Sequence, residues 1–197
     1  MRRRTFDALM VVAGLALTAL LLVAGGLLTW GHSVVTSDVH SQLAAQKIYF
    51  PAASSPEIKS LPAADAAAMK LYAGQLMTTG AQAQTYADHF IAVHLREAAG
   101  GLTYSQVSYL AMTHPNNAKY AAEDATLFKG NSLRGMLLSA YGFWKIGQIV
   151  LIAAFAAFIG AALLLILSFA GIWHLRRVPE EAEVLSKITH AARVQTA

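Results

Sequence analysis

Two long stretches without a charged residue constrain this sequence more than any other feature. The first covers residues 8–37 and the second covers residues 146–175. A helix that crosses a lipid bilayer needs about 20 consecutive, mostly apolar residues, and both stretches are longer than this. The sequence therefore predicts two transmembrane helices, at residues 8–30 and 146–174, and makes the lipid bilayer an expected partner.

The composition of the chain agrees with this interpretation. The chain is 56% hydrophobic and 13% charged, whereas charged residues make up about 25% of a typical soluble domain. The segment between the two stretches, residues 31–145, carries eight Lys or Arg residues and seven Asp or Glu residues. Because this segment is nearly neutral, the net charge of +4 does not indicate a basic nucleic-acid-binding surface, and we expect no nucleic-acid partner.

The ends of the two stretches carry the excess positive charge. These basic residues are Arg2, Arg3, Arg4, Arg176 and Arg177. Basic residues next to a membrane span stay in the cytoplasm. We therefore expect a multi-pass plasma-membrane protein of the cell envelope, with a cytoplasmic N-terminus at residues 1–7, an extracytoplasmic domain at residues 31–145 and a cytoplasmic tail at residues 175–197.

A cleaved signal peptide is the alternative interpretation of the first stretch. A signal peptide also begins with basic residues followed by an apolar run, but that run is typically about 7–15 residues long. The uncharged run here is longer, and no cleavage site of the A-x-A type follows it. Both interpretations leave the middle segment outside the cytoplasm.

Helix-breaking residues divide the middle segment into helices rather than strands, so the predicted fold class is all-α. The four-residue spacing of apolar residues after residue 30 predicts that the first helix continues to about residue 48. Residues 51–62 contain three prolines and are predicted to form a loop. A helical period of apolar residues predicts the next helix around residues 69–76, ended by Thr79-Gly80.

The remainder of the middle segment shows the same kind of pattern. Residues 82–99 have the period of an amphipathic helix, and two glycines follow it. Thr103 followed by Gln106 forms a capping box, which predicts the start of another helix. A further helix is expected to end at Gly130, and an apolar stripe over residues 133–144 then leads into the second span.

Small residues in the second span predict a face for close helix packing. They recur at three- and four-residue spacing, which places them along one side of a helix where another backbone can approach. The residues of this face are Ala153, Ala156, Ala157, Gly160 and Ala161. Its partner is expected to be either the first span or another chain.

The sequence contains no pattern that predicts a catalytic or metal site. It has no cysteine, which excludes disulfides and thiolate ligands. The histidines of the middle segment are His32, His40, His89, His94 and His114. His89 and His94 are five residues apart and would project about 140° apart on a helix, so they cannot share an ion. We predict no metal, no cofactor and no catalytic residue.

Aromatic residues offer one alternative site. Enclosed between the helices, they would line a pocket for a ligand. The residues of this predicted pocket are Tyr72, Tyr86, Phe90 and Tyr104.

Four short segments resemble a known group of proteins. They are YADHFI at residues 86–91, AGGLTYS at 99–105, TLFKG at 126–130 and LRGMLL at 133–138. They resemble a group of small actinobacterial membrane proteins of unknown function, over roughly residues 30–150. The resemblance implies two spans around an external helical domain. Some members are described as aromatic ring-opening dioxygenases, which need converging iron ligands, and no catalytic residue is carried over to this chain.

These observations lead to one functional hypothesis and two alternatives. The first hypothesis is a non-enzymatic cell-envelope membrane protein, an accessory or interaction subunit that contacts other membrane proteins or a second copy of itself. The first alternative is an extracytoplasmic domain that binds or senses a ligand. The second is a metal-dependent enzyme, suggested only by the histidines.

Overall fold

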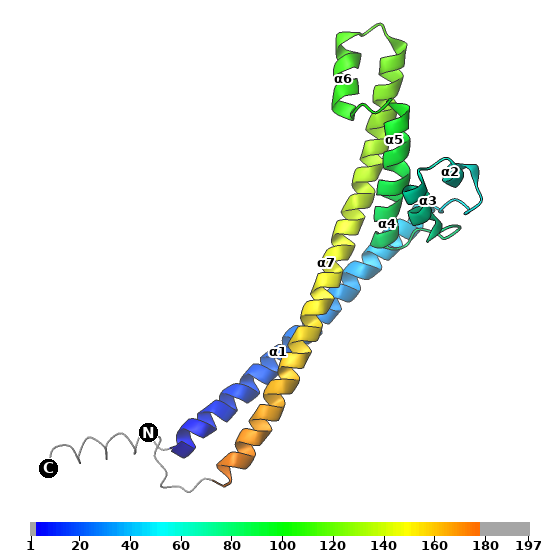
Figure 1. Cartoon of the computed structure of the whole chain (residues 1–197). Helices are drawn as coiled ribbons and strands as arrows, with labels where there is room; N and C mark the ends of the chain where they lie inside the picture. Colours follow the sequence, from blue (N-terminus) through cyan, green and yellow to red (C-terminus); the bar gives the residue numbers. More distant parts are fainter. Residues whose placement is uncertain (1–2, 178–197) are drawn as a thin grey trace, which may run out of the picture. The chain divides into compact units, whose positions relative to one another are not determined.

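A computed structural model describes residues 3–177 of the chain (Figure 1). Helices make up 81% of these residues, and none of them belongs to a strand. The predicted all-α fold class is therefore confirmed. The tail that was predicted to follow the second span lies, from residue 178 on, outside the described residues.

Two long helices contain the uncharged stretches. Helix α1 (Arg3–Ala45) and helix α7 (Ala118–Leu175) are each long and apolar enough to cross a membrane. Only 11% of the most apolar window of each helix is buried, whereas the core helix of a soluble protein would bury most of such a window. Exposed apolar side chains on this scale fit a lipid environment.

The chain divides into two compact units. Of the described residues, the first unit contains 3–30 and 150–177, and the second contains 31–149. In the first unit the two helices run antiparallel, because a Cβ atom placed on Gly14 would meet Ser168 and one placed on Gly25 would meet Phe158.

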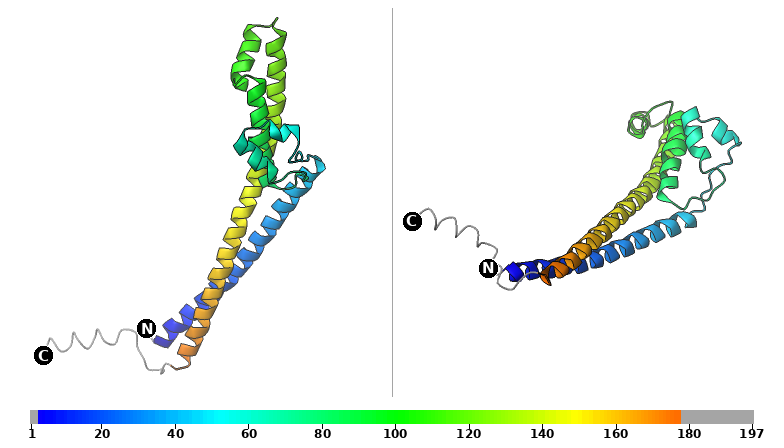
Figure 2. Two further views of the ribbon diagram at one scale, coloured as in Figure 1. Left: turned by 45° about the vertical axis from the view of Figure 1, so that its right-hand side comes forward. Right: turned by 60° about the horizontal axis from the view of Figure 1, so that its bottom comes forward.

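The second unit contains the shorter helices together with parts of α1 and α7 (Figure 2). These elements are α2 (Pro56–Lys59), α3 (Ala63–Lys70), α4 (Gly80–Tyr86), the π-helical turn η1 (Ala87–Ile91), α5 (Ala92–Ala98) and α6 (Tyr104–Thr113). The main hydrophobic core lies between α1, α3, α4, η1 and α7. Its largest fully enclosed side chains are those of Phe50, Ile58, Met69 and Met77.

The region between α1 and α4 differs in part from the sequence prediction. Residues 51–62 are not entirely a loop, since α2 forms there with Ser55 as its N-cap. Helix α3 begins earlier than predicted and ends at Lys70, so the prediction of a helix over residues 69–76 was wrong. The reason lies in the turn that follows, where Gly74 has φ = 73° and the chain then forms a single bridge between Tyr49 and Leu76.

The predicted helix over residues 82–99 is confirmed, with one modification and an earlier start. Thr79 does not end the preceding helix as predicted but caps α4, through a capping box with Gln82. The helical run from α4 to α5 contains the π-helical turn η1, in which the N–H of Ala92 donates to the carbonyl oxygen of Ala87. A π-helical turn inserts one extra residue into the helix.

Helix α6 and the beginning of α7 form a hairpin that agrees with the sequence prediction at its first boundary. Gly100 and Gly101 have φ values of 57° and 90°, and they end α5 as predicted. The predicted capping box between Thr103 and Gln106 begins α6. The hairpin has its own small core, in which Val107 and Leu127 are fully buried.

Helix α7 is continuous where the sequence predicted a break. It runs from Ala118 to Leu175 without interruption, so the predicted stop at Gly130 was wrong. Gly130 has a packing role instead: a Cβ atom there would lie 2.3 Å from Cδ2 of Leu95, on α5. The absence of a side chain at residue 130 therefore lets α5 approach α7 closely.

Candidate functional site

An open groove between α1 and α7 is the main candidate site of the second unit. Its volume is about 660 Å³, within the range of about 300–1,000 Å³ that is usual for ligand-binding pockets. The groove, called here the α1–α7 groove, is lined by Val35, Asp38, Val39, Gln42, Leu43, Gln46, Ile48, Leu133, Met136, Leu137, Ser139, Ala140 and Phe143.

The floor and the edges of the groove differ in exposure. Val39, Leu43 and Leu137 form a buried floor that also belongs to the main core. Met136 and Phe143, in contrast, expose 70% and 62% of their surface at the edge. Large apolar side chains of this kind, held beside a rigid floor, are typical of surfaces that bind another molecule.

The polar side chains of the groove lie mainly on α1. Asp38, Gln42 and Gln46 recur every four residues and are all exposed, so they follow one edge of the groove. Helix α7 contributes only Ser139, whose hydroxyl donates to the carbonyl oxygen of Gly135 within the same helix. The groove thus has two apolar walls and a single polar edge.

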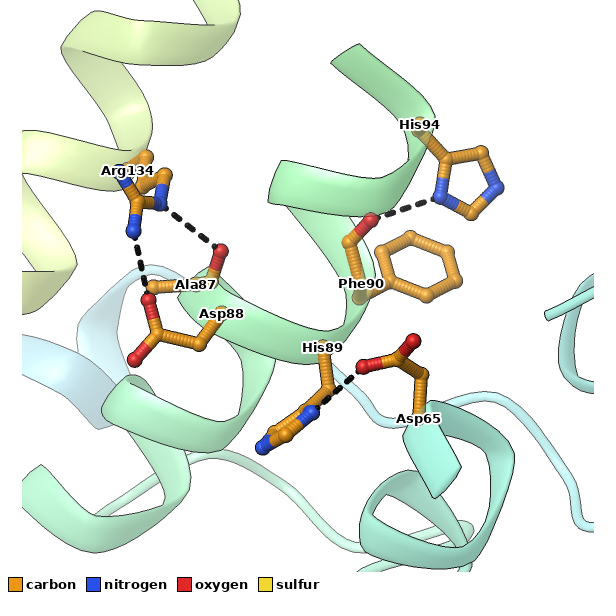
Figure 3. Close-up of polar contacts among 7 residues, drawn as sticks. All are labelled: Asp65, Ala87, Asp88, His89, Phe90, His94 and Arg134. Carbon is orange, nitrogen blue, oxygen red and sulfur yellow. Dashed lines mark hydrogen bonds and ion pairs between the residues drawn. The ribbon is translucent and has the colours of Figure 1, made fainter. Parts of the chain in front are cut away.

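A set of polar contacts links η1 to α3 and α7 (Figure 3). Arg134 of α7 donates from Nη2 to the Asp88 carboxylate, at 2.7 Å, and from Nε to the carbonyl oxygen of Ala87, at 3.2 Å. On the same turn, Nδ1 of His89 lies 2.7 Å from the Asp65 carboxylate of α3. The π-helical turn therefore connects α3 and α7 through neighbouring side chains.

Three of the four residues of the predicted aromatic pocket are brought together. Tyr72 and Tyr86 both contact the Phe50 ring, with ring centroids 5.3 and 5.4 Å away. Phe90 contacts Tyr86 at 4.8 Å. These rings pack against one another and against the main core. Burial raises the pKa of the Tyr86 phenol above its ordinary value.

The fourth residue of that predicted pocket lies elsewhere. Tyr104 is at the start of α6, where its ring contacts Phe128 at a centroid distance of 6.0 Å. It borders a separate depression of about 440 Å³ together with Arg96 and Arg134. The predicted set of four residues therefore does not surround one pocket.

Four of the five histidines of the middle segment each contact a different partner. His32 contacts the carbonyl oxygen of Gly147 through Nδ1, at 2.9 Å, and His94 contacts that of Phe90, at 2.8 Å. His114 contacts the carbonyl oxygen of Leu110, and His40 is exposed. Among residues 3–177, no group of three or more His, Cys, Asp or Glu side chains has the geometry to hold a metal ion.

The small residues of the predicted packing face in α7 are divided between two sides of the helix. Ala161 is buried, Ala157 and Gly160 are half-buried, and a Cβ atom on Gly160 would lie 3.3 Å from Cδ1 of Leu21. Ala153 and Ala156 are exposed. The side that meets α1 in the first unit thus contains part of the predicted set.

Comparison with protein families, with curated proteins and with solved structures finds no match.

The sequence indicated the two apolar helix faces that form the walls of the groove, but not that these faces lie opposite one another. The spacing of Val35, Val39 and Leu43 and the stripe over residues 133–144 each indicate an apolar helix face. Periodicity alone does not indicate which faces oppose one another. The sequence holds no signal that assigns Asp38, Gln42 and Gln46 to the same surface as the apolar stripe on α7.

Proposed function

We propose that the chain is a non-enzymatic membrane protein of the cell envelope, an accessory or interaction subunit that binds another membrane protein through its external helical domain. The α1–α7 groove is the observation that carries this proposal. It combines a buried floor at Leu43 and Leu137 with exposed apolar side chains at Met136 and Phe143. Surfaces of this composition form the centres of protein interfaces.

The proposed orientation keeps both termini in the cytoplasm. It is supported by the arginines next to each span. The guanidinium of Arg177 lies over the Trp173 ring, at 4.3 Å from the centroid, a contact that fits a membrane interface on either side. Tryptophan and arginine are common at membrane interfaces. A cytoplasmic reporter fused after Ala197 should be active, and protease added to intact spheroplasts should cleave between residues 31 and 145. A reporter active only outside the cell would refute this orientation.

Site-specific photocrosslinking in cells tests the interaction directly. Met136 and Met112 are matched positions, since both are methionines of the second unit and expose 70% and 72% of their surface. Only Met136 lines the groove. A photoreactive amino acid at position 136 should form an adduct with a defined protein that also copurifies from native membranes, whereas position 112 should not.

A pair of serine variants provides the matched control for this experiment. Ser139 and Ser132 are both exposed on α7, and each hydroxyl donates to the carbonyl oxygen four residues earlier. Ser139→Trp places a large side chain in the groove and should abolish copurification, while Ser132→Trp should not. Equal adduct yields at positions 136 and 112, or retention of the partner by Ser139→Trp, would refute the proposed function.

Binding of a small apolar ligand is the alternative function, and the volume of the groove favours it specifically. A volume of about 660 Å³ is sufficient for such a ligand. Native mass spectrometry of the protein released from native membranes distinguishes the two functions. A bound small molecule that disappears in Ser139→Trp but not in Ser132→Trp would support ligand binding.

We also propose that the chain is related to the actinobacterial two-span proteins that its motifs resemble. Two of those motifs contain residues of the contacts described above: Asp88 and His89 lie in YADHFI, and Arg134 lies in LRGMLL. If the relationship holds, relatives should preserve a carboxylate at position 88 together with a guanidinium at position 134.

A further inference from the structure

Helix α7 has one covered side and one uncovered side in the second unit. Gly130 and Trp144 face α5 and α4, since Cβ atoms built on Gly130 and Gly80 would meet Leu95 and Trp144. Met136 and Phe143 lie on a different side, roughly 80–140° around the helix from those positions. That side is exposed although it is apolar.

The groove beside the uncovered side of α7 is long enough to hold a short helix. The groove extends from Val35 on α1 to Gln46, directly after the end of that helix, and from Leu133 to Phe143 along α7. At 1.5 Å per residue, these walls are about 15–16 Å long, which corresponds to about three helical turns. Because both walls are helices, their side-chain ridges form grooves that a third helix can fill.

The charge of the groove indicates which charge its occupant should carry. Asp38 is the only charged residue among those that line it. Within residues 3–177, the Asp38 carboxylate forms no ion pair. A Lys or Arg side chain at the edge of an occupant would complement this carboxylate, and an anionic lipid headgroup would be repelled by it.

We propose that the α1–α7 groove binds an amphipathic helix of about three turns that belongs to another envelope protein. Apolar residues at positions i, i+3 or i+4, and i+7 of that helix contact Leu137, Met136 and Phe143. A Lys or Arg residue beside this apolar stripe pairs with Asp38. This inference rests on the proposed function, because it names the kind of partner that the interaction subunit binds.

Two synthetic peptides test the inference while the partner is still unidentified. Each is an amphipathic helix of about 12 residues with the same leucine stripe, and the two differ only in a Lys or a Glu beside it. Binding to the full-length protein in zwitterionic nanodiscs is measured by fluorescence anisotropy, with empty nanodiscs as the background. The Lys peptide should bind about two- to five-fold more tightly than the Glu peptide, the range expected for one exposed ion pair.

Variants assign this preference to the groove. Asp38→Asn should remove the preference for the Lys peptide, whereas Glu97→Gln, at an exposed acid of α5 that does not line the groove, should retain it. Ser139→Trp should weaken the binding of both peptides, and Ser132→Trp should not. Circular dichroism of each variant verifies that its helices are intact.

Some contrary results would refute the proposed kind of partner, and one would refute the proposed function itself. Equal affinities of the two peptides, or a preference that persists in Asp38→Asn, would refute the amphipathic basic helix but not the interaction function. A lipid adduct at position 136, or an adduct with a second copy of this chain, would also refute it and would identify the alternative occupant. The absence of any protein adduct at position 136 in cells would refute the proposed function itself.

Discussion

The two units of this chain hold their helices together in different ways. In the first unit, α1 and α7 meet through Gly14 and Gly25, where even a Cβ atom would lie within 3 Å of the opposite helix. In the second unit, the helices are joined through large enclosed side chains, including Phe50, Met69 and Met77. The same two long helices take part in both arrangements.

The surroundings that we propose for the two units, lipid for the first and water for the second, account for this difference. Between helices in lipid there is little hydrophobic driving force, so association depends on close van der Waals contact, which small residues permit. In water, by contrast, the burial of large apolar side chains supplies most of the stability. The second unit should therefore be sensitive to loss of side-chain volume, and the first unit to gain of volume.

The largest expected effect is the loss of a large core side chain in the second unit. Phe50 is 2% exposed and contacts the rings of Tyr72 and Tyr86. Phe50→Ala should lower the free energy of unfolding by about 3–5 kcal/mol, because it leaves a cavity. Guanidinium unfolding in mild detergent, followed by Trp144 fluorescence in a background without the other tryptophans, measures this.

Leu71→Ala provides the control for this measurement, since Leu71 is 73% exposed. Its effect should be within about 0.5 kcal/mol. A similar loss of stability in both variants would show that the core around Phe50 does not hold the unit together.

A second prediction concerns Gly80, a glycine of the second unit that lies against Trp144. A Cβ atom on Gly80 would lie 2.3 Å from Cβ of Trp144, an atom that cannot rotate away. Gly80→Ala should therefore destabilise the unit by about 1–3 kcal/mol. Gly135→Ala is the matched variant on α7, where nothing lies within 4 Å, and it should stabilise by about 0.5–1 kcal/mol. If Gly80→Ala and Gly135→Ala changed the free energy of unfolding in the same direction, this result would contradict the close packing of α4 on α7.

Two adjacent glycines test the close contact in the first unit. A Cβ atom on Gly25 would lie 2.8 Å from the Phe158 ring, whereas one on Gly26 would have nothing within 4 Å. Gly25→Ala should separate the helices and cost about 1 kcal/mol, less than Gly80→Ala because the Phe158 ring can tilt. Crosslinking between cysteines introduced at Leu21 and Gly160 should slow in Gly25→Ala and remain unchanged in Gly26→Ala. Equal rates in the two variants would contradict the small-residue packing.

The sequence predicted the helices more accurately than their contacts. Both apolar helices and the capping box at Thr103 were predicted, because each depends on neighbouring residues along the chain. The break at Gly130 was predicted wrongly, since a glycine ends a helix in one setting and permits close packing in another. Only the position of Leu95 on α5, far along the chain, distinguishes these two roles.

The candidate site was less predictable for the same reason. Tyr72, Tyr86 and Phe90 belong to one packed aromatic cluster rather than to the lining of a pocket, and Phe50, the ring that joins two of them, was not part of the predicted set. No pattern of residues near Asp38 in the sequence indicated that it belongs to a site. Its significance arises from the apolar residues of α7 that lie across the groove, which local periodicity does not contain.

The smallest predicted effect is a dependence of the second unit on high pH. Burial raises the pKa of the Tyr86 phenol above its ordinary value near 10. The folded state then keeps this proton at a pH at which the unfolded state loses it, so stability is complete below pH 10 and declines above it. One group of this kind accounts for a decline of at most about 1.4 kcal/mol per pH unit. Tyr86→Phe should make the unfolding free energy less dependent on pH above 10 while leaving it nearly unchanged at pH 7. If the unfolding free energy of Tyr86→Phe depended on pH as steeply as that of the unaltered protein, the effect would belong to other groups. Tyr109→Phe provides the control, since Tyr109 is 63% exposed.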